Sequence, residues 1–379
     1  MSVSTFRLRT GLRPTGLEID LGAVRANVTR LRELAGVDVC AVVKADGYGH
    51  GAVEVARAAS EAGATWLAVA LVEEGIELRE AGVDAPILVL SEPPIPAVPE
   101  LLDARLTPTG YREPFLAALA GAGEQRGTPV SVHLKLDTGM GRVGVPPSEL
   151  SDRLRQAAGS QWLAVDGLLT HLARADEPDV ATTGQQLDAF DRAVATADGL
   201  GLRPRWRHAA NTAGALLHPA SRYDLIRPGI GIYGLSPAAE VAAQDHGLVP
   251  ALRLSSQVSQ AKRIPAGTPV SYGHRWQAPT EGWLATVPIG YADGVPRALS
   301  DRAQVLIGGV RHPMVGAVTM DQLLVWCGER EPAVGDEVVL LGGQGGQLIR
   351  VEEWAAAADT ITYEIVTRLS ARLPRIHRG

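Results

Sequence analysis

The sequence predicts an α/β protein: an eight-fold (β/α) barrel followed by a smaller, mainly-β C-terminal domain. Short apolar runs alternate with helical stretches from residue 37 to about residue 233, and short runs joined by tight turns follow from about residue 245. The first pattern is typical of βα units around a parallel sheet, and the second of an antiparallel β domain. The 379 residues suffice for a barrel of about 250 residues and a second unit.

Seven apolar runs are the expected barrel strands, and the eighth is expected near residues 105–110. Helical periodicity fits between them, as in residues 52–63 and 72–82, where glycine closes each segment. The proline-rich residues 91–100 interrupt a βα unit and do not mark a linker, because sheet-like runs resume beyond them. The seven runs are residues 37–43, 66–71, 86–91, 130–136, 162–171, 204–209 and 223–228.

The domain boundary is expected near residues 238–248. This gives a barrel domain of residues 1–242 and a β-rich C-terminal domain of residues 243–379, with residues 1–12 expected to pack on the latter. One helix-like stretch is expected over residues 351–373, after the last strand.

Composition excludes several classes of function. The net charge of −6 comes from interspersed signs, so we expect no nucleic-acid partner and no anionic membrane partner. No apolar stretch approaches the roughly 18 residues that span a bilayer, and no signal peptide is visible, so a cytoplasmic protein is expected. Cys40 and Cys327 lack metal-ligand spacing and are expected to be buried and reduced, and we expect no metal site.

Lys44 follows the apolar run Val42-Val43 and precedes the glycine-rich residues 45–51. A lysine there keeps its stem dry and its amine at the mouth of the strand, which suits a Schiff-base nucleophile. In a parallel barrel, catalytic groups collect at the carboxyl ends of the strands. Six polar residues lie at or just after expected strand ends: Lys44, Lys135, Arg142, His171, Asn211 and Arg227.

Nine segments resemble those of bacterial alanine racemases, enzymes that use pyridoxal 5'-phosphate. They stand in order along nearly the whole chain, so the resemblance is specific. The segments are AVVKADGYGHG (41–51), HLKLDTGMGRVG (133–144), GLLTHLARADE (167–177), HAANTAGAL (208–216), IRPGIGIYGLSP (226–237), VSYG (270–273), PIGYADGVPR (288–297), MDQ (320–322) and TYE (362–364).

The resemblance implies a two-base racemisation of alanine. Lys44 would bind the cofactor covalently and then act on D-alanine, while Tyr272 would act on L-alanine from the opposite face of the substrate carbon. A phenol is a poor base at neutral pH, and His171 followed by Arg227 is expected to favour its ionised form. Arg227 would face the pyridine nitrogen and, because a guanidinium stays protonated, would leave that nitrogen unprotonated.

The resemblance also implies how cofactor and substrate are held. Arg142 would contact the phenolic oxygen of the cofactor and the substrate carboxylate, and the N–H of Met320 would bind that carboxylate. Tyr291 and Met320 would narrow the substrate entry, and Lys135 is a candidate for a carbamate that holds Arg142. The implied cofactor-binding residues are Lys44, Tyr48, Arg142, His171, Asn211, Thr212, Arg227, Gly229, Ile230 and Tyr363.

A homodimer with shared active sites is also implied, in which the partner subunit supplies Tyr272 and Met320. The enzyme would supply D-alanine for peptidoglycan. Two positions depart from the family's pattern: Thr212 stands where many relatives have serine, and Ala317 where relatives often have a basic or polar residue. Neither departure removes a catalytic group.

Other functions stay open. The nearest is a racemase of broader range or for serine, or one that protects a producer of an alanine-mimicking antibiotic. Basic amino-acid decarboxylases share the barrel-plus-β-domain plan, although Tyr272 and the segment at residues 320–322 favour racemisation. A pyridoxal phosphate-binding homeostasis protein without turnover belongs to another class, and such single-barrel proteins lack the domain that carries Tyr272.

Overall fold

The computed structural model describes residues 12–177 and 181–379, and this part of the chain forms two compact units. The barrel unit comprises residues 24–48 and 52–249, and the β unit comprises residues 12–23, 49–51 and 250–379. Of residues 1–12, which are expected to pack on the β domain, only Leu12 lies within the described residues, so that expectation stays a prediction.

The barrel unit contains eight parallel strands in the order β8-β7-β6-β5-β4-β3-β2-β9. Two backbone hydrogen bonds beside the ends of β8 and β9 nearly close the ring: Asp224 N–H donates to Arg207 O at 3.1 Å, and Arg227 N–H to Ala210 O at 2.9 Å. All eight expected strands are present. They are β2 (Asp38–Val42), β3 (Trp66–Val69), β4 (Ile87–Val89), β5 (Thr107–Gly110), β6 (Val130–Lys135), β7 (Leu163–Leu169), β8 (Trp206–His208) and β9 (Leu225–Ile226).

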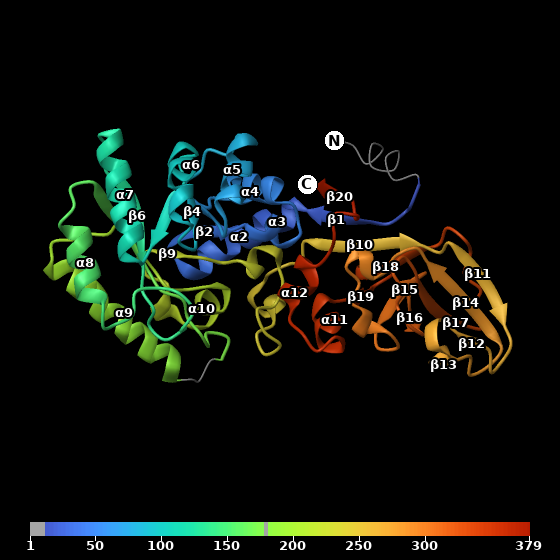
Figure 1. Cartoon of the computed structure of the whole chain (residues 1–379). Helices are drawn as coiled ribbons and strands as arrows, with labels where there is room; N and C mark the ends of the chain where they lie inside the picture. Colours follow the sequence, from blue (N-terminus) through green and yellow to red (C-terminus); the bar gives the residue numbers. More distant parts are fainter. Residues whose placement is uncertain (1–11, 178–180) are drawn as a thin grey trace. The chain divides into compact units, whose positions relative to one another are not determined.

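Helices follow the barrel strands, and α7, α8 and α9 lie outside the strands in Figure 1. The proline-rich residues 91–100 lie between β4 and β5 and lead into a short helix, as expected. The helices of this part of the chain are α2 (Leu21–Ala35), α4 (Ala52–Glu61), α5 (Val72–Glu80), α6 (Val98–Asp103), α7 (Glu113–Arg126), α8 (Leu150–Ala158), α9 (Ala181–Gly199) and α10 (Thr212–Leu217).

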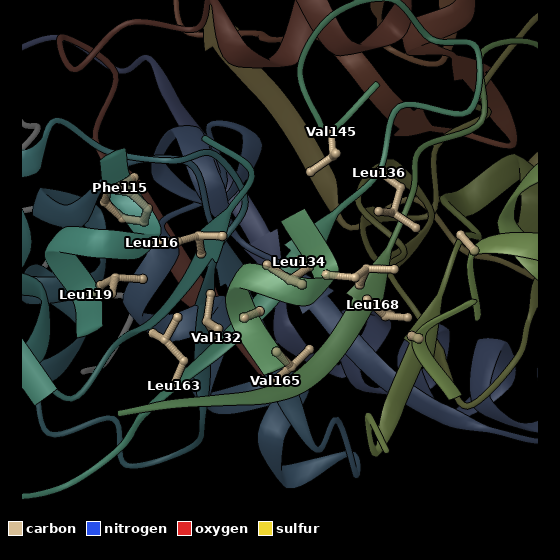
Figure 2. Close-up of a cluster of buried hydrophobic side chains, with 14 of the residues drawn as sticks. Phe115, Leu116, Leu119, Val132, Leu134, Leu136, Val145, Leu163, Val165 and Leu168 are labelled. Carbon is tan, nitrogen blue, oxygen red and sulfur yellow. The ribbon is translucent and has the colours of Figure 1, made fainter. Parts of the chain in front are cut away.

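Strand β6 explains why polar residues lie inside the barrel. Successive side chains of a strand point to opposite faces. Val132 and Leu134 belong to the same buried apolar cluster as Phe115 of α7 (Figure 2). The alternate residues His133 and Lys135 therefore point into the barrel, and they are only 0% and 6% exposed. Each large apolar side chain of the cluster contributes roughly 1.5 to 3 kcal/mol, which offsets the cost of burying these polar groups.

The β unit is built on a sheet in the order β11-β14-β17-β16-β15-β18-β10-β1-β20, with β19 paired to β18 and a separate pair β12-β13. Strand β1 pairs antiparallel with β10 and parallel with β20, so the range expected for the barrel contains a strand that pairs within the β unit. The strands are β1 (Gly16–Asp20), β10 (Leu252–Gln257), β11 (Gln260–Ile264), β12 (Pro269–Val270), β13 (Trp276–Gln277), β14 (Gly282–Val287), β15 (Gln304–Ile307), β16 (Val310–Val315), β17 (Leu323–Gly328), β18 (Glu337–Gln344), β19 (Gln347–Ile349) and β20 (Arg375–Arg378).

The single helix-like stretch expected over residues 351–373 is wrong in detail, because the structure has two helices there, α11 (Val351–Ala357) and α12 (Thr362–Thr367). The break falls at Asp359, whose φ of 56° lies in the left-handed region that a right-handed helix does not pass through. Trp354 and Ile365 are both buried at helical spacing, so the periodicity continues across the break.

Both cysteines are buried and free, as expected. Burial raises the pKa of the Cys40 thiol to about 12 and that of Cys327 to about 11, so both stay protonated at neutral pH. Among the described helices, none is both long enough and apolar enough to cross a membrane.

Candidate active site

Lys44 is the second residue after β2 and opens a left-handed turn. Residues 45–48 have φ values of 52°, 51°, 59° and 53°, so the segment labelled α3 (Lys44–Tyr48) is not a right-handed helix. Ala45, Asp46 and Tyr48 are not glycine, and each L-residue in this region costs roughly 1 to 2 kcal/mol. The turn therefore stores about 3 to 6 kcal/mol of strain, which the surrounding fold must hold.

Glu74 of α5 holds the left-handed turn at Ala45. One carboxylate oxygen accepts the N–H of Ala45 at 2.7 Å, and the other accepts the N–H groups of Ala70 and Leu71 at 2.8 and 3.1 Å. One side chain therefore ties the end of β2 to the end of β3. Sequence reasoning missed Glu74, although it is the third residue of a helix, the glutamate position of a capping box.

The amine of Lys44 lies in a cluster of cations. Burial and then Arg142 lower the pKa of Lys44, while the charge of Glu74 acts in the opposite direction. Burial, followed by Arg227, Arg142 and Lys44, lowers the pKa of Lys135 to about 8. Positive charges that gather in this way attract an anionic ligand and make both amines easier to deprotonate.

Arg227 is 4% exposed and is held by a dense set of acceptors. Its Nη1 donates to His208 Nδ1 at 2.9 Å and to His208 O at 2.8 Å, and its Nη2 donates to Thr170 O at 2.7 Å and Ala209 O at 3.1 Å. The same Nη2 lies 3.5 Å from His171 Nδ1. Burial lowers the pKa of Arg227 to about 10, so the guanidinium remains a cation at neutral pH.

Arg227 also sets the tautomers of two buried histidines. Burial and the charge of Arg227 lower the pKa of His133 to about 3 and hold that of His208 well below its ordinary value, so both rings are neutral. A guanidinium only donates, so His208 Nδ1 accepts and His208 Nε2 carries the proton. That Nε2–H faces His133 Nδ1 at 3.0 Å. Sequence reasoning missed His208, although it opens one of the nine matched segments.

A tight cradle surrounds Gly229. The hydroxyl of Thr212 accepts the N–H groups of Gly229 and Gly231, each at 3.2 Å. On another side, a Cβ added to Gly229 would come within 2.3 Å of the Tyr48 hydroxyl oxygen, so only glycine fits. Ile230 opens a 3-10 helix (η3, Ile230–Tyr233), and the N–H of a first helical residue has no acceptor within its own helix. The cradle thus combines hydroxyl groups with backbone N–H groups.

Arg142 and Asn211 lie on loops organised by short polar contacts. Asp137 Oδ1 accepts the N–H groups of Gly139 and Gly141, both at 3.0 Å, and this shapes the loop that carries the exposed Arg142. Asn211 is the N-cap of α10, and its side-chain oxygen accepts the N–H of the third helical residue at 2.9 Å. Both loops follow barrel strands, β6 and β8.

Tyr272 lies in the β unit, in strained backbone. It opens a 3-10 turn (η5, Tyr272–His274) between Ser271, with φ of 62°, and His274, with φ of 46°. Such conformations cost energy and concentrate at functional sites. Ser271 Oγ donates to Ala317 O at 2.8 Å. Tyr272 is 75% exposed and borders a cavity of about 340 Å³ together with Ser271, Thr319, Gln322 and Leu324.

Tyr291 and Met320 lie on two loops that hydrogen-bond to each other. Tyr291 N–H donates to Thr319 O at 2.9 Å, and Ala292 N–H donates to Met320 O at 3.0 Å. Met320 N–H itself has no protein acceptor among the described residues. Tyr363, the second residue of α12, is half-buried.

The predicted site residues thus fall into two sets. The barrel unit brings together the cations around Lys44 and the cradle around Gly229, and the β unit brings Tyr291 next to Met320. The barrel set is Lys44, Tyr48, Lys135, Arg142, His171, Asn211, Thr212, Arg227, Gly229 and Ile230, and the β-unit set is Tyr272, Tyr291, Met320 and Tyr363.

Comparisons with known proteins cover nearly the whole chain. The family models described as "Alanine racemase, N-terminal domain" and "Alanine racemase, C-terminal domain" match residues 19–237 and 251–377. An alanine racemase of Symbiobacterium thermophilum is 48% identical over 371 residues, which is 97% of this chain and 98% of the relative.

Two solved structures extend the comparison. The alanine racemase of Streptomyces coelicolor A3(2) has a TM-score of 0.94 and 42% identity, over 98% of this chain and 99% of the other. A histidine racemase of Leuconostoc mesenteroides has a TM-score of 0.87 and 28% identity, over 97% and 98%.

A cation-lined barrel mouth and a second, β-rich unit define the barrel-plus-β-domain class of enzymes. Within that class, this chain belongs to the alanine racemase family.

Proposed function

We propose that this enzyme interconverts L-alanine and D-alanine, with pyridoxal 5'-phosphate bound at Lys44. The observation that carries the proposal is the position of the Lys44 amine, at a strand mouth, among cations and with a lowered pKa. The residues present fit the cofactor. The cradle around Gly229 excludes a Cβ and places the hydroxyl groups of Tyr48 and Thr212 near the N–H of Ile230, which suits a phosphate, and Arg227 is a buried cation suited to the ring.

When bound, the cofactor supplies an electron sink for the negative charge that develops at the substrate Cα. Lys44 holds or removes the proton on one face of that carbon, and its lowered pKa increases the fraction of neutral base. Arg227 stays protonated and would leave the ring nitrogen unprotonated, which limits charge delocalisation and so disfavours protonation on the cofactor. Arg142 and the free N–H of Met320 would bind the substrate carboxylate.

The second base in this proposal is Tyr272, provided by the other subunit of a homodimer. The exposure of Tyr272 on the β unit supports this, since a large side chain at 75% exposure is available to a partner. Mixing Lys44→Ala chains with Tyr272→Phe chains should restore part of the activity, because one of the two shared sites in a heterodimer is intact. Verified heterodimers without any recovery would contradict shared sites.

We also propose that Lys135 carries a carbamate. Only a neutral amine reacts with carbon dioxide, and the pKa of about 8 leaves a usable neutral fraction at physiological pH. The product is an anion among cations, able to hold Arg142. An additional mass of about 44 Da on the Lys135 peptide would support the carbamate, and a plain ammonium in a structure determined under carbon dioxide would contradict it.

The decisive experiment is a panel of amino acids in D2O. Inversion of alanine with deuterium incorporation at Cα supports racemisation, whereas release of carbon dioxide supports decarboxylation. Binding of the cofactor without loss of optical rotation from L-alanine would indicate a homeostasis protein. The panel includes histidine, because a histidine racemase shares this fold. It includes serine, because a substrate pocket discriminates against one added group by only about 1 to 3 kcal/mol.

The expected role is supply of D-alanine for peptidoglycan in the cytoplasm, with the small amino acid as substrate and a second copy of the chain as partner. Two buried free thiols are consistent with a reducing compartment. A strain that lacks this chain and requires D-alanine for growth would support the role, and one that grows normally without any other racemase would contradict it.

A further inference from the structure

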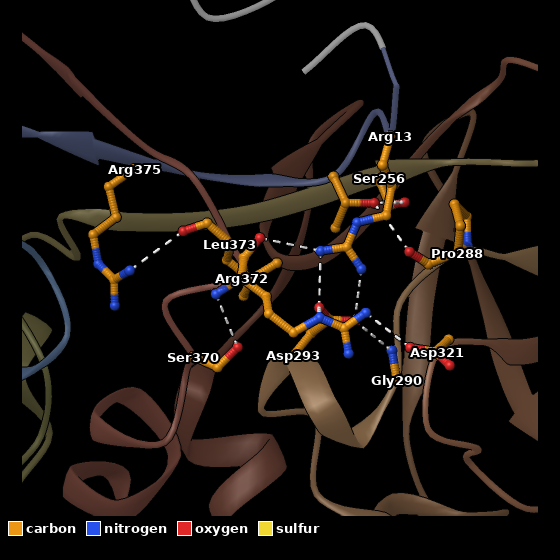
Figure 3. Close-up of polar contacts among 11 residues, drawn as sticks. Arg13, Ser256, Pro288, Gly290, Asp293, Asp321, Ser370, Arg372, Leu373 and Arg375 are labelled. Carbon is orange, nitrogen blue, oxygen red and sulfur yellow. Dashed lines mark hydrogen bonds and ion pairs between the residues drawn. The ribbon is translucent and has the colours of Figure 1, made fainter. Parts of the chain in front are cut away.

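An ionic chain of four side chains crosses the β unit (Figure 3). Arg13 Nη1 donates to Asp293 Oδ2 at 2.9 Å, and its Nη2 lies 2.8 Å from Asp293 Oδ1. Arg372 Nε lies 3.4 Å from the same Oδ1, and its Nη2 donates to Asp321 Oδ1 at 2.8 Å. Charges alternate along the chain, from a fully buried Asp293 carboxylate to an exposed Asp321 carboxylate.

The buried end of the ionic chain holds the loop that carries Tyr291. Asp293 Oδ2 accepts the N–H of Gly290 at 3.0 Å, which closes the turn around Tyr291. Asp293 O accepts the N–H of Ser370 at 3.0 Å. The turn lies directly on its neighbour, since a Cβ added to Gly290 would come within 2.2 Å of Thr319 O. The backbone of the Tyr291 loop therefore has little freedom.

The exposed end of the ionic chain holds the turn that carries Met320. The turn is closed at its base, where the N–H and Oγ1 of Thr319 donate to Gln322 O at 3.0 and 2.8 Å. Met320 and Asp321 form its tip. Arg372 contacts the tip by donating to the Asp321 carboxylate. The Met320 N–H has no acceptor in the described part of the chain and is available to a ligand.

The exposed pair acts on position more than on stability. The side chains of Arg372 and Asp321 are 46% and 59% exposed, so water screens their attraction and the pair contributes little to the free energy of unfolding. The pair still restrains the turn, because Arg372 holds the Asp321 carboxylate at the tip while the hydrogen bonds of Thr319 hold the base. The pair therefore biases where the Met320 N–H points.

We propose that Arg372 is a positioning residue. By joining the buried Asp293 to the turn tip at Asp321, it fixes the Met320 N–H relative to the Tyr291 side chain and so restricts the size of the amino acid admitted. The inference rests on the proposed function, in which those two residues bind and confine the substrate. A loosened tip would bind the substrate carboxylate less well and leave more room beyond Cβ.

The test compares variants of the full-length enzyme. Arg372→Gln and Asp321→Ala each remove the exposed pair and leave the Arg13 pair with Asp293 in place, and Arg372→Lys is the conservative variant. We expect KM for L-alanine to rise roughly 3- to 10-fold with kcat within about twofold, and the ratio of kcat/KM for serine to that for alanine to rise over the same range. Arg372→Lys should recover part of both changes, because an ammonium keeps the charge.

The matched control is Arg311→Gln, which breaks a two-bond pair with Glu353 elsewhere in the β unit. It should leave KM and the serine ratio unchanged, with a thermal midpoint no higher than that of Arg372→Gln. A purely structural role for Arg372 predicts that the two variants behave alike, and that result would overturn the inference.

Amide hydrogen exchange gives a reading that does not depend on racemisation. The N–H groups of Tyr291 and Ala292 bond to the Met320 turn, so their exchange should quicken at least about threefold in Arg372→Gln and stay unchanged in Arg311→Gln. If the exchange rates of these two N–H groups are unchanged in both variants, the inference is wrong, whatever the substrate of the enzyme is. An unmodified enzyme that fails to racemise alanine would overturn the proposed function, and the exchange result would still decide whether Arg372 positions the turn.

Discussion

Replacing Glu74 by glutamine should weaken cofactor binding while the barrel stays folded. Glutamine keeps one acceptor oxygen and places an NH2 group where the second carboxylate oxygen stood, so it cannot accept all three N–H groups of Ala45, Ala70 and Leu71. If the oxygen stays with Ala70 and Leu71, which follow β3, the Ala45 N–H loses a charge-assisted hydrogen bond. At this solvent-exposed position the loss is about 1 to 2 kcal/mol.

The turn carries about 3 to 6 kcal/mol of backbone strain, so without this hydrogen bond we expect it to relax. The cofactor must then re-form the turn when it binds. The affinity for pyridoxal 5'-phosphate should therefore fall roughly 5- to 30-fold. A second effect has the opposite sense. The charge of Glu74 raises the pKa of Lys44, so its removal should lower that pKa further and make the free amine more reactive at a given pH.

Two assays separate these effects. Titration of cofactor-free protein, followed by the absorbance of the lysine-bound cofactor, measures the affinity. Trace acylation of Lys44 across pH, read by mass spectrometry, measures its titration. Glu73→Gln removes the same charge from an exposed side chain in the same helical turn and is the control. If Glu74→Gln binds the cofactor as tightly as the unmodified protein, or its Lys44 titrates as in Glu73→Gln, the reasoning about the turn is wrong.

In carbon dioxide-free buffer, Lys135→Met should raise the free energy of unfolding at pH 7 by about 3 kcal/mol, measured with urea. The folded pKa of about 8 lies below the ordinary 10.5, so the buried cation costs stability below pH 8, and this cost fades as pH rises toward 10.5. Gly229→Ala should weaken binding of the cofactor at least about tenfold in an equilibrium titration, because the new Cβ would come within 2.3 Å of the Tyr48 hydroxyl oxygen. His208→Leu leaves a donor of Arg227 unpaired and should cost about 2 to 3 kcal/mol in urea unfolding, and His208→Asn should recover part of it.

Each of these expectations has a result that would contradict it. A Lys135→Met protein that is less stable than its parent without carbon dioxide would mean that the ammonium is stabilised where we expect a penalty. Gly229→Ala should differ from Gly121→Ala, whose Cβ meets open space on α7, and equal affinities would refute the steric argument. Equal stability of His208→Leu and its parent would show that Arg227 finds another acceptor.

The barrel could be predicted because each strand carries its own local pattern. Apolar runs such as β2 and β3 are buried on both faces of a parallel sheet, so nearly every residue in them is apolar. Strand β5 is the weakest in sequence, Thr-Pro-Thr-Gly, and its place was predicted from the count of units more than from its residues. The apolar periodicity predicted one helix over residues 351–373, but Asp359 has a positive φ and divides this stretch into two helices.

The candidate site likewise contains residues that local sequence patterns predict and residues that they do not. Lys44 could be recognised because a lysine after an apolar run and before glycines is a local signal. Glu74 has a local capping-box signal for its bonds to Ala70 and Leu71, but no local signal reveals its bond to Ala45, 29 positions earlier. The bond of His208 to His133, 75 positions away, has no local signal either. Only parallel pairing of the strands brings such groups together.

By itself, the sequence determined the alternation of strands and helices, the burial of both cysteines and the place of Lys44 at a strand mouth, because each depends on side-chain chemistry within a few residues. Tertiary structure alone decided that residues 16–20 join the β unit, that Arg227 fixes the protons of two histidines, and that an ionic chain ties the Tyr291 loop to the Met320 turn. Those outcomes depend on which distant backbone segments come within hydrogen-bonding distance, and no local pattern encodes that adjacency.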